Sequence, residues 1–269
     1  MRQLILCIVT ILSFVSCNND PSIQLRTAKL KRIISYANTA KNQIRGMTTF
    51  EYDTRNNLIK QSEFYTDTAK AYSYLVFEYE NDRKTFEYKY DLTNDIYSLS
   101  QKKTYKYNWD LLIKNEVMKL PDSIVTNYTL YFYDKNRNLI QTSEIQCVGE
   151  NSNHITEYEY DSDNLKTKTI HYEGNSGMKE YIKHYYENKL LVNEKVYTTD
   201  DQLISENNYE YDSNSYLIKQ TVIIAGKKMH EESIIYANMR IVEKISYDFF
   251  YTDGSHGYYM IDAVYEYEK

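Results

Sequence analysis

The sequence predicts an all-β protein built from tandem antiparallel β-hairpins. Tyrosine is unusually abundant, with 31 Tyr against 8 Phe and 1 Trp in 269 residues. An aromatic-x-Tyr pair recurs along the chain, and residues i and i+2 share one face of a β-strand. Helical spacing of apolar residues is absent, apart from a weak possibility at Leu25–Ala40. The 7 Gly and 2 Pro are too few for a collagen-like or Pro/Gly-rich disordered chain.

The second aromatic of each pair anchors a repeat of about 26 residues. After the anchor comes an acid or amide, then a short polar turn, and then an apolar residue that opens a return strand, as in Tyr133, Asp134 and Leu139. Asp and Asn favour such turns because they bond their own backbone. Two strands and two turns fill one period. The anchors are Tyr52, Tyr79, Tyr107, Tyr133, Tyr160, Tyr186, Tyr211, Tyr236 and Tyr267, at steps of 25 to 31 residues.

The repeats predict one large sheet. About seventeen strands would form a ribbon about 80 Å wide, and an open sheet of that size is expected to curl, split or close. One hairpin cannot bury its own face, so neighbouring hairpins must stabilise one another. We therefore expect a single domain over residues 29–269, in which the hairpins form a curved, wrapped or barrel-like sheet with the aromatic pairs inside.

The pattern Tyr-x-Tyr-Asp-x-x-x-x-Leu resembles the YD repeat of Rhs-type and teneurin-like proteins. The best matches are Tyr52-Asp53…Leu58, Tyr133-Asp134…Leu139 and Tyr211-Asp212…Leu217. The family's turn glycine is replaced by Asn56, Arg137 and Ser215, and the resemblance covers most of residues 45–269. It implies tandem hairpins that wrap around a hollow in the large family members. A chain of this length looks more like the small YD-like lipoproteins of Gram-negative bacteria, whose functions are mostly unassigned.

Residues 1–17 read as an export signal. Arg2 precedes an apolar run, Leu4–Val15, which is too short to span a bilayer but suits a signal peptide. The end, Phe14 to Cys17, resembles a bacterial lipobox, which implies cleavage before Cys17 and acylation of its thiol. An ordinary secretory leader cut near Ser16 is the alternative. Residues 18–28 would form a tether. We expect a lipid anchor in the outer membrane, on its periplasmic or its cell-surface side.

Charge and motifs argue against several classes of function. The net charge is −6 and no Lys/Arg block occurs, which argues against a nucleic-acid partner. Cys147 is interpreted as a small hydrophobe in a strand, and the five His, in the absence of metal-binding spacing, as structural. No catalytic residue, metal or cofactor is expected. Four acidic turns are interpreted as Asx turns rather than calcium loops; they begin at Asp53, Asp134, Asp161 and Asp212.

Aromatic residues outside the regular repeat are the candidates for ligand binding. Most tyrosines are interpreted as core, whereas Trp109, Tyr251, Tyr258 and Tyr259 are expected to be exposed. The segment 251–259 reads as a long hairpin turn in preference to a binding loop. The sequence thus favours a non-catalytic binding or structural module whose partner is a glycan or an envelope protein. The alternatives are an envelope enzyme acting on glycans through a carboxylate pair, and an assembly partner that adds strands at a sheet edge.

Overall fold

The computed structural model describes residues 29–37, 40–65, 70–149, 153–174, 177–237, 240–252 and 255–267, and within 250–259 only the backbone. This part of the chain forms β1 (Leu30–Tyr36), β2 (Ile44–Tyr52), β3 (Leu58–Phe64), β4 (Ser73–Glu80), β5 (Arg83–Thr93), β6 (Ile96–Asn108), β7 (Leu111–Lys119), β8 (Ile124–Tyr133), β9 (Leu139–Gln146), β10 (Asn153–Tyr160), β11 (Lys166–Glu173), β12 (Met178–Glu187), β13 (Leu190–Thr198), β14 (Leu203–Tyr211), β15 (Leu217–Ile224), β16 (Lys227–Ala237), β17 (Arg240–Thr252) and β18 (Ser255–Tyr267).

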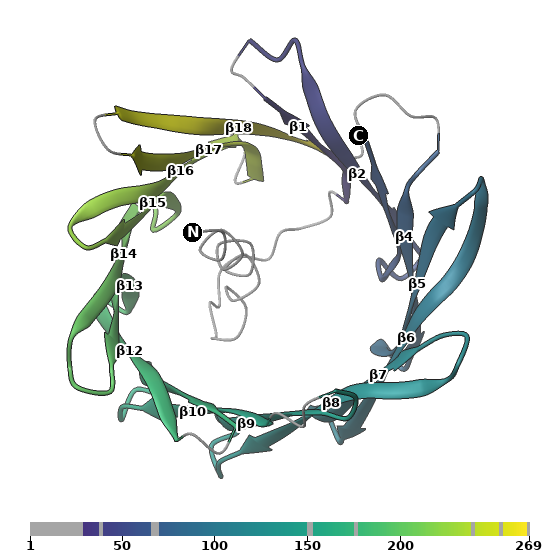
Figure 1. Cartoon of the computed structure of the whole chain (residues 1–269), viewed down its shortest axis with the longest axis horizontal. Coiled ribbons are helices and arrows are strands. Elements are labelled where there is room, and N and C mark those ends of the chain that lie inside the picture. The colour runs from purple at the N-terminus through teal and green to yellow at the C-terminus, as the bar shows by residue number, and fades with distance from the viewer. Residues whose placement is uncertain are drawn as a thin grey trace.

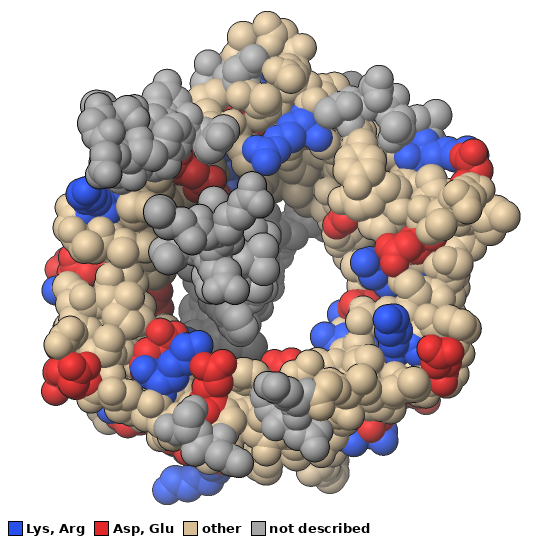
Figure 2. Space-filling view, in the orientation of Figure 1, with Lys and Arg blue, Asp and Glu red and all other residues tan. Residues whose placement is uncertain are grey.

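These strands form one closed barrel. Each strand pairs antiparallel with its neighbours in sequence, and β1 pairs with both β2 and β18, which closes the ring (Figure 1). Figure 2 shows an opening through the ring, bordered by Lys, Arg, Asp and Glu. The expectation of an all-β, barrel-like sheet is confirmed, with 18 strands where about seventeen were expected. The helical possibility at Leu25–Ala40 is wrong over Leu30–Tyr36, which is β1.

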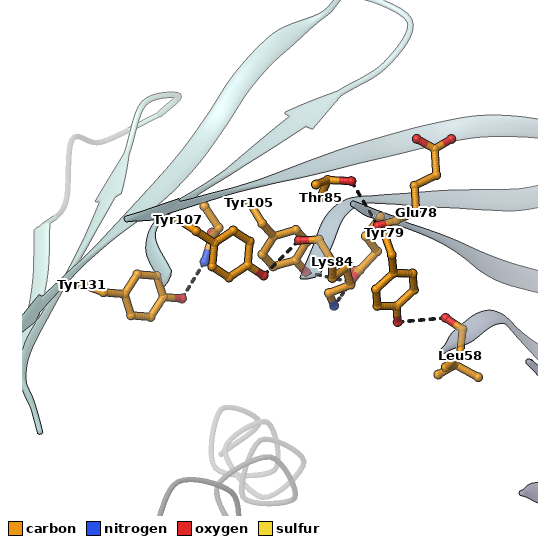
Figure 3. A network of polar contacts seen from close by, with 10 residues as sticks. Leu58, Glu78, Tyr79, Lys84, Thr85, Tyr105, Tyr107 and Tyr131 are labelled. Atoms are coloured by element: carbon orange, nitrogen blue, oxygen red, sulfur yellow. Dashed lines mark hydrogen bonds and ion pairs between the residues drawn. The ribbon is translucent and has the colours of Figure 1, made fainter. Parts of the chain in front are cut away.

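The aromatic pairs point into the barrel. Figure 3 shows Tyr79, Tyr105 and Tyr131 on the concave side of the ribbon, while Glu78 projects from the other side. Side chains alternate along a strand and directly opposite residues share a face, so the printed strand register assigns the remaining side chains to the inner or the outer face. The inner face carries the aromatic pairs, as the repeat predicts.

The turn after four of the anchors, Tyr52, Tyr133, Tyr160 and Tyr211, is an Asx turn. One oxygen of Asp134, Oδ1, accepts hydrogen bonds from the backbone N–H groups of Asn136 and Asn138, both at 2.8 Å. Arg137 completes the turn in the left-handed region, with φ of 70°. The same carboxylate-to-backbone bonds occur at Asp53, Asp161 and Asp212. These acids are therefore occupied in shaping turns, as the sequence indicated.

At most anchors, the tyrosine joins its hairpin to the preceding one. The pairing shifts by one residue between Phe132 and Tyr133, so the return strand holds one extra residue, Ile140, as in a β-bulge. The Tyr133 hydroxyl then reaches back across the sheet and donates to the carbonyl of Leu112 at 2.9 Å. Equivalent bonds run from Tyr79 to Leu58, Tyr107 to Lys84, Tyr160 to Leu139, Tyr211 to Leu191, Tyr236 to Leu217 and Tyr267 to Ile241.

Two local predictions are wrong. Cys147 is not a core residue of a strand; it is an exposed, free thiol, because the chain leaves the sheet after Gln146 and turns through Gly149, whose φ is 93°. The segment 251–259 is not a long hairpin turn. The backbone of β17 and β18 stays paired as far as Thr252 opposite Ser255, so most of this segment is strand.

Candidate binding surface inside the barrel

The inner wall carries a belt of cross-strand pairs. In the seven hairpins from β2–β3 to β14–β15, the first aromatic of the repeat, or the residue that replaces it, lies opposite a polar side chain of the return strand. We call these residues the inner belt: Phe50 with Gln61, Phe77 with Glu87, Tyr105 with Asn115, Tyr131 with Thr142, Tyr158 with Thr169, His184 with Glu194 and Tyr209 with Gln220. Aromatic rings and hydrogen-bonding groups therefore alternate along the inner wall from β2 to β15, whereas Ile234 faces Lys244 and Tyr265 faces Ile33 beyond it.

One part of the belt centres on Glu87. Its Oε2 accepts a hydrogen bond from the Tyr105 hydroxyl at 2.8 Å and lies 2.9 Å from the Lys84 ammonium. Burial alone would raise the pKa of Glu87, but the contacts with Lys84 and Tyr105 outweigh it and the pKa is lowered. Burial and the nearby carboxylate raise the pKa of Tyr105. At neutral pH the site therefore holds an ionised acid and a protonated phenol.

A second part centres on Glu194. His184 places Nδ1 2.7 Å from Glu194 Oε1, and its Nε2 lies 2.9 Å from the hydroxyl of Thr169. The Tyr209 hydroxyl donates to Glu194 Oε2 at 2.5 Å. Burial works to raise the pKa of Glu194, yet the bonds from His184 and Tyr209 lower it. This carboxylate, too, stays ionised at neutral pH.

The order Thr169–His184–Glu194 is that of a hydroxyl, imidazole and carboxylate triad, but the setting does not suit catalysis. Thr169 is only 5% exposed, which leaves little access for a substrate. Its backbone is paired with Tyr158 on one side and Ile182 on the other, within the β-ladder. A triad also needs donors aimed at a developing oxyanion, and ladder N–H groups are already engaged. The arrangement fixes the side chains of the wall.

A polar recess lies farther along the inner wall, over β8, β9 and β10. It has a volume of about 320 Å³ and is lined by Thr126, Asn127, Glu144, Gln146 and His154. The amide of Asn127 donates to Glu144 at 3.0 Å. Every lining side chain carries a hydrogen-bonding group, so the recess suits a hydroxyl-rich ligand better than an apolar one.

The predicted site residues are not brought together. Trp109 is 84% exposed, but it lies in the turn between β6 and β7, with φ of 56°, and not on the inner belt. The side chains of Tyr251, Tyr258 and Tyr259 lie outside the described residues, as does Cys17. Most described tyrosines are half-buried in the wall. Those on the inner face are therefore partly accessible from the hollow, whereas the sequence interpretation had them as core.

Two of the histidines contact threonines of the preceding strand: His171 contacts Thr156, and His184 contacts Thr169. Within the described ranges, no three His, Cys, Asp or Glu side chains are grouped so as to hold a metal ion. The described part of the chain contains no helix long and apolar enough to cross a membrane.

The polar members of the inner belt were missed from the sequence. Glu87 and Glu194 lie at the same place in their repeats, three residues after the residue that pairs with the anchor tyrosine, Lys84 and Leu191 respectively. The same offset gives Gln61, Asn115 and Thr142 in other hairpins. An alignment of the return strands on that residue would have revealed a polar column facing the aromatic one.

Among known proteins, only solved structures are similar to this chain. No family model matches the chain, and no curated protein matches it. A porin-like protein from Bacteroides uniformis ATCC 8492 is similar with a TM-score of 0.48 and 8% identity, over 90% of this chain and 99% of that one. A porin-like protein from Bacteroides vulgatus ATCC 8482 gives 0.36 and 11%, over 70% and 100%. TcdB2-TccC3 gives 0.25 and 11%, over 84% of this chain and 16% of that one. At these TM-scores the likenesses carry no argument about what this chain does.

Proposed function

We propose that the protein is a non-catalytic binding module of the cell envelope, held to the outer membrane by an acylated Cys17, and that it binds a glycan inside the barrel. The inner belt is the observation that supports this. Half-buried tyrosines alternate there with carboxylate, amide and hydroxyl groups, as in Tyr131 beside Asn115 and Tyr158 beside Thr169. A sugar presents both an apolar ring face and hydroxyls, so it matches a wall of this composition.

The outer face supports a barrel that stands in water and does not contact lipid. Lys114 lies 2.7 Å from Glu116, and Lys219 lies 3.2 Å from Glu210 and 3.5 Å from Glu231, all on the outer side of their strands. A lipid-facing lysine at mid-membrane depth costs about 2–4 kcal/mol. Ion pairs of this kind, within a strand and between neighbouring strands, are ordinary on a water-exposed sheet. The tether at 18–28 would hold such a barrel away from the membrane.

The contacts of the acidic side chains favour binding over glycoside hydrolysis. Glycosidases place two carboxyl groups about 5–10 Å apart across an open cleft. Glu243 and Asp262 are neighbouring acids, and the Lys41 ammonium lies 2.9 Å from the first and 3.8 Å from the second. Asp262 is 1% exposed, so no sugar reaches it. On the inner wall, Glu87 and Glu194 are each tied to their own donors.

The proposal is tested with the soluble chain beginning at Asn18, screened against neutral glycans and peptidoglycan fragments by calorimetry and tyrosine fluorescence. We expect saturable binding of one glycan class. Tyr131→Ala, on the inner belt, should weaken it. Phe132→Ala is the matched control, because its neighbouring ring is 43% exposed on the outer face. Failure of every glycan to bind would overturn the proposed ligand, and protein partners would then be sought by crosslinking.

The lipid anchor is tested separately in cells. Labelled palmitate should be incorporated into the full chain and should be lost in Cys17→Ala. Incorporation that survives this substitution would contradict acylation at Cys17.

A further inference from the structure

Three lysines lie side by side on the outer face of the barrel. Lys183 on β12 is directly opposite Lys168 on β11 and Lys195 on β13. We call these three residues the lysine row. Like charges directly opposite each other destabilise an antiparallel sheet, so the row has an energetic cost that folding alone does not require. Glu159 lies opposite Lys168 and Glu206 opposite Lys195 at the two ends of the row.

The charge at the middle of the row is not neutralised. Lys168 and Lys195 have acids at 3.8 Å and 2.8 Å, respectively. Lys183 forms no ion pair with any carboxylate of the described residues; its ammonium lies over the rings of Tyr197 and Tyr181, at 5.2 and 5.7 Å from their centroids. These contacts hold the cation at the surface without cancelling its charge.

Another pair of opposed lysines has its charge repulsion relieved by a neighbouring acid. Lys106 and Lys114 also face each other, on β6 and β7. There Glu116 is shared between them, at 3.8 and 2.7 Å. The absence of any such acid beside Lys183 among the described residues therefore distinguishes the lysine row from the other opposed pair.

An exposed aromatic ring completes the surface. Along β12 the outer face reads Tyr181, Lys183, Tyr185, because alternate residues share a face. Tyr181 is buried and stacks on Tyr197 at 5.1 Å. Tyr185 is 42% exposed, and the ammonium of Lys195 lies 5.9 Å from its ring centroid. The row thus offers a flat apolar ring next to positive charge.

We propose that the outer face of β11, β12 and β13 binds an acidic glycan. The sugar carboxylates accept hydrogen bonds from the lysine row, with Lys183 as the central donor, and a sugar ring packs on Tyr185. The sign of the charge identifies an anion. The exposed ring favours a sugar as the ligand in preference to an inorganic ion. The row extends about 10 Å across three strands, which suits a chain of sugars. This surface lies on the opposite face of the sheet from the inner belt.

The test compares the soluble chain and its variants for binding to polygalacturonate and to neutral dextran by calorimetry at physiological salt. We expect the acidic polymer to bind and dextran not to bind this surface. Lys183→Gln should weaken polygalacturonate binding about tenfold, the loss of one charge-assisted hydrogen bond, and Tyr185→Ala should also weaken it. Lys102→Gln is the matched control, since Lys102 is also an outer-face lysine, with its ammonium 4.4 Å from the Phe86 ring centroid.

Equal binding by wild type and Lys183→Gln would overturn the proposal. So would binding to phosphatidylglycerol vesicles without binding to polygalacturonate, which would identify a lipid surface. Lys183→Gln should not change the affinity for any neutral glycan that binds on the inner belt. The acidic-glycan proposal and the inner-belt proposal can therefore fail independently. The same variant should melt no lower than wild type, because it relieves repulsion, and this establishes that it folds.

Discussion

The hydroxyl of Tyr133 donates a hydrogen bond of 2.9 Å to the backbone carbonyl of Leu112, 21 residues earlier and in the preceding hairpin. The same contact recurs at most anchors, with distances from 2.8 to 3.0 Å. It explains why the second position of the repeat is Tyr and not Phe. A phenol ring covers the neighbouring strand, and its hydroxyl satisfies a carbonyl beside a bulge.

Tyr133→Phe should lower the free energy of unfolding by about 1 kcal/mol, because it keeps the ring and removes one hydrogen bond. Urea unfolding measures the change. Tyr128→Phe is the control: Tyr128 lies on the outer face of the same strand, opposite Glu116, and its ring carries the ammonium of Lys114 at 4.6 Å. An equal loss in both variants, or no loss in Tyr133→Phe, would refute the role of the bond.

Ser215→Gly should stabilise the protein. Ser215 has φ of 66° in the Asx turn after Asp212, and a left-handed conformation costs an L-residue about 1–2 kcal/mol. The greater freedom of glycine in the unfolded chain offsets part of that gain, which leaves about 0.5 kcal/mol. Asn164→Gly, at φ of 61° in the equivalent turn, should gain less, because Asn tolerates this region. A lower melting temperature for Ser215→Gly would show that its side chain contributes to the turn.

Asp262→Asn should stabilise the barrel at pH 7.5 by about 1–3 kcal/mol. Burial, with Glu243 nearby, raises the pKa of Asp262 from 3.8 to about 6, against the opposing effect of Lys41. The folded state then binds more protons than the unfolded one, so the contribution of this group is greatest below pH 4 and is lost as the pH rises through 6. The difference between the urea unfolding midpoints at pH 5 and pH 7.5 should be smaller in the variant than in the wild type. Glu51→Gln, at an exposed ion pair with Lys60, should keep the wild-type difference.

The barrel should lose stability above pH 10. Burial raises the pKa of Tyr186 and of Tyr265 to about 12, and it also raises the pKa of Tyr209. Unfolded tyrosine ionises near pH 10, so above that pH the unfolded state releases protons that the folded state retains, and stability falls. The ultraviolet absorbance of phenolate, followed with pH, should show these groups titrating late in buffer and normally in denaturant. Identical curves in both solvents would mean that the phenols are solvated in the folded barrel.

Much of the local structure follows from the spacing of residues in the sequence. The sequence Tyr133-Asp134 predicts the end of a strand followed by an Asx turn, and both are present. Closure of the sheet is different, because it depends on strand tilt and on the accumulated stagger between strands. No single residue encodes that quantity. The sequence therefore left the choice open between a curved, a wrapped and a barrel-like sheet.

The functional surfaces were harder to predict than the fold. The partnership of His184 with Glu194 joins two strands of one hairpin, and a fixed offset in the repeat could have revealed it. The lysine row depends on pairing across two connections of different kinds, a tight turn on one side of each strand and a variable loop on the other. The offset that pairs His184 with Glu194 also places Lys195 opposite Lys183. Register across a variable loop is not specified by a local pattern, so Lys168 could not be placed beside Lys183 in advance.

Closure has a consequence for how the chain folds. Arg32 on β1 holds Glu266 on β18 through two hydrogen bonds of 2.7 and 3.1 Å, across 234 residues of sequence. Nearly every other pairing joins consecutive strands, so hairpins can zip together locally and fast, whereas this seam must wait for the most distant encounter in the molecule. Until then the two edge strands of the open sheet present unpaired backbone N–H and C=O groups. Strands of separate molecules can join at such edges. The rate of ring closure, and not the rate of hairpin formation, should therefore determine how long the chains can associate wrongly with one another.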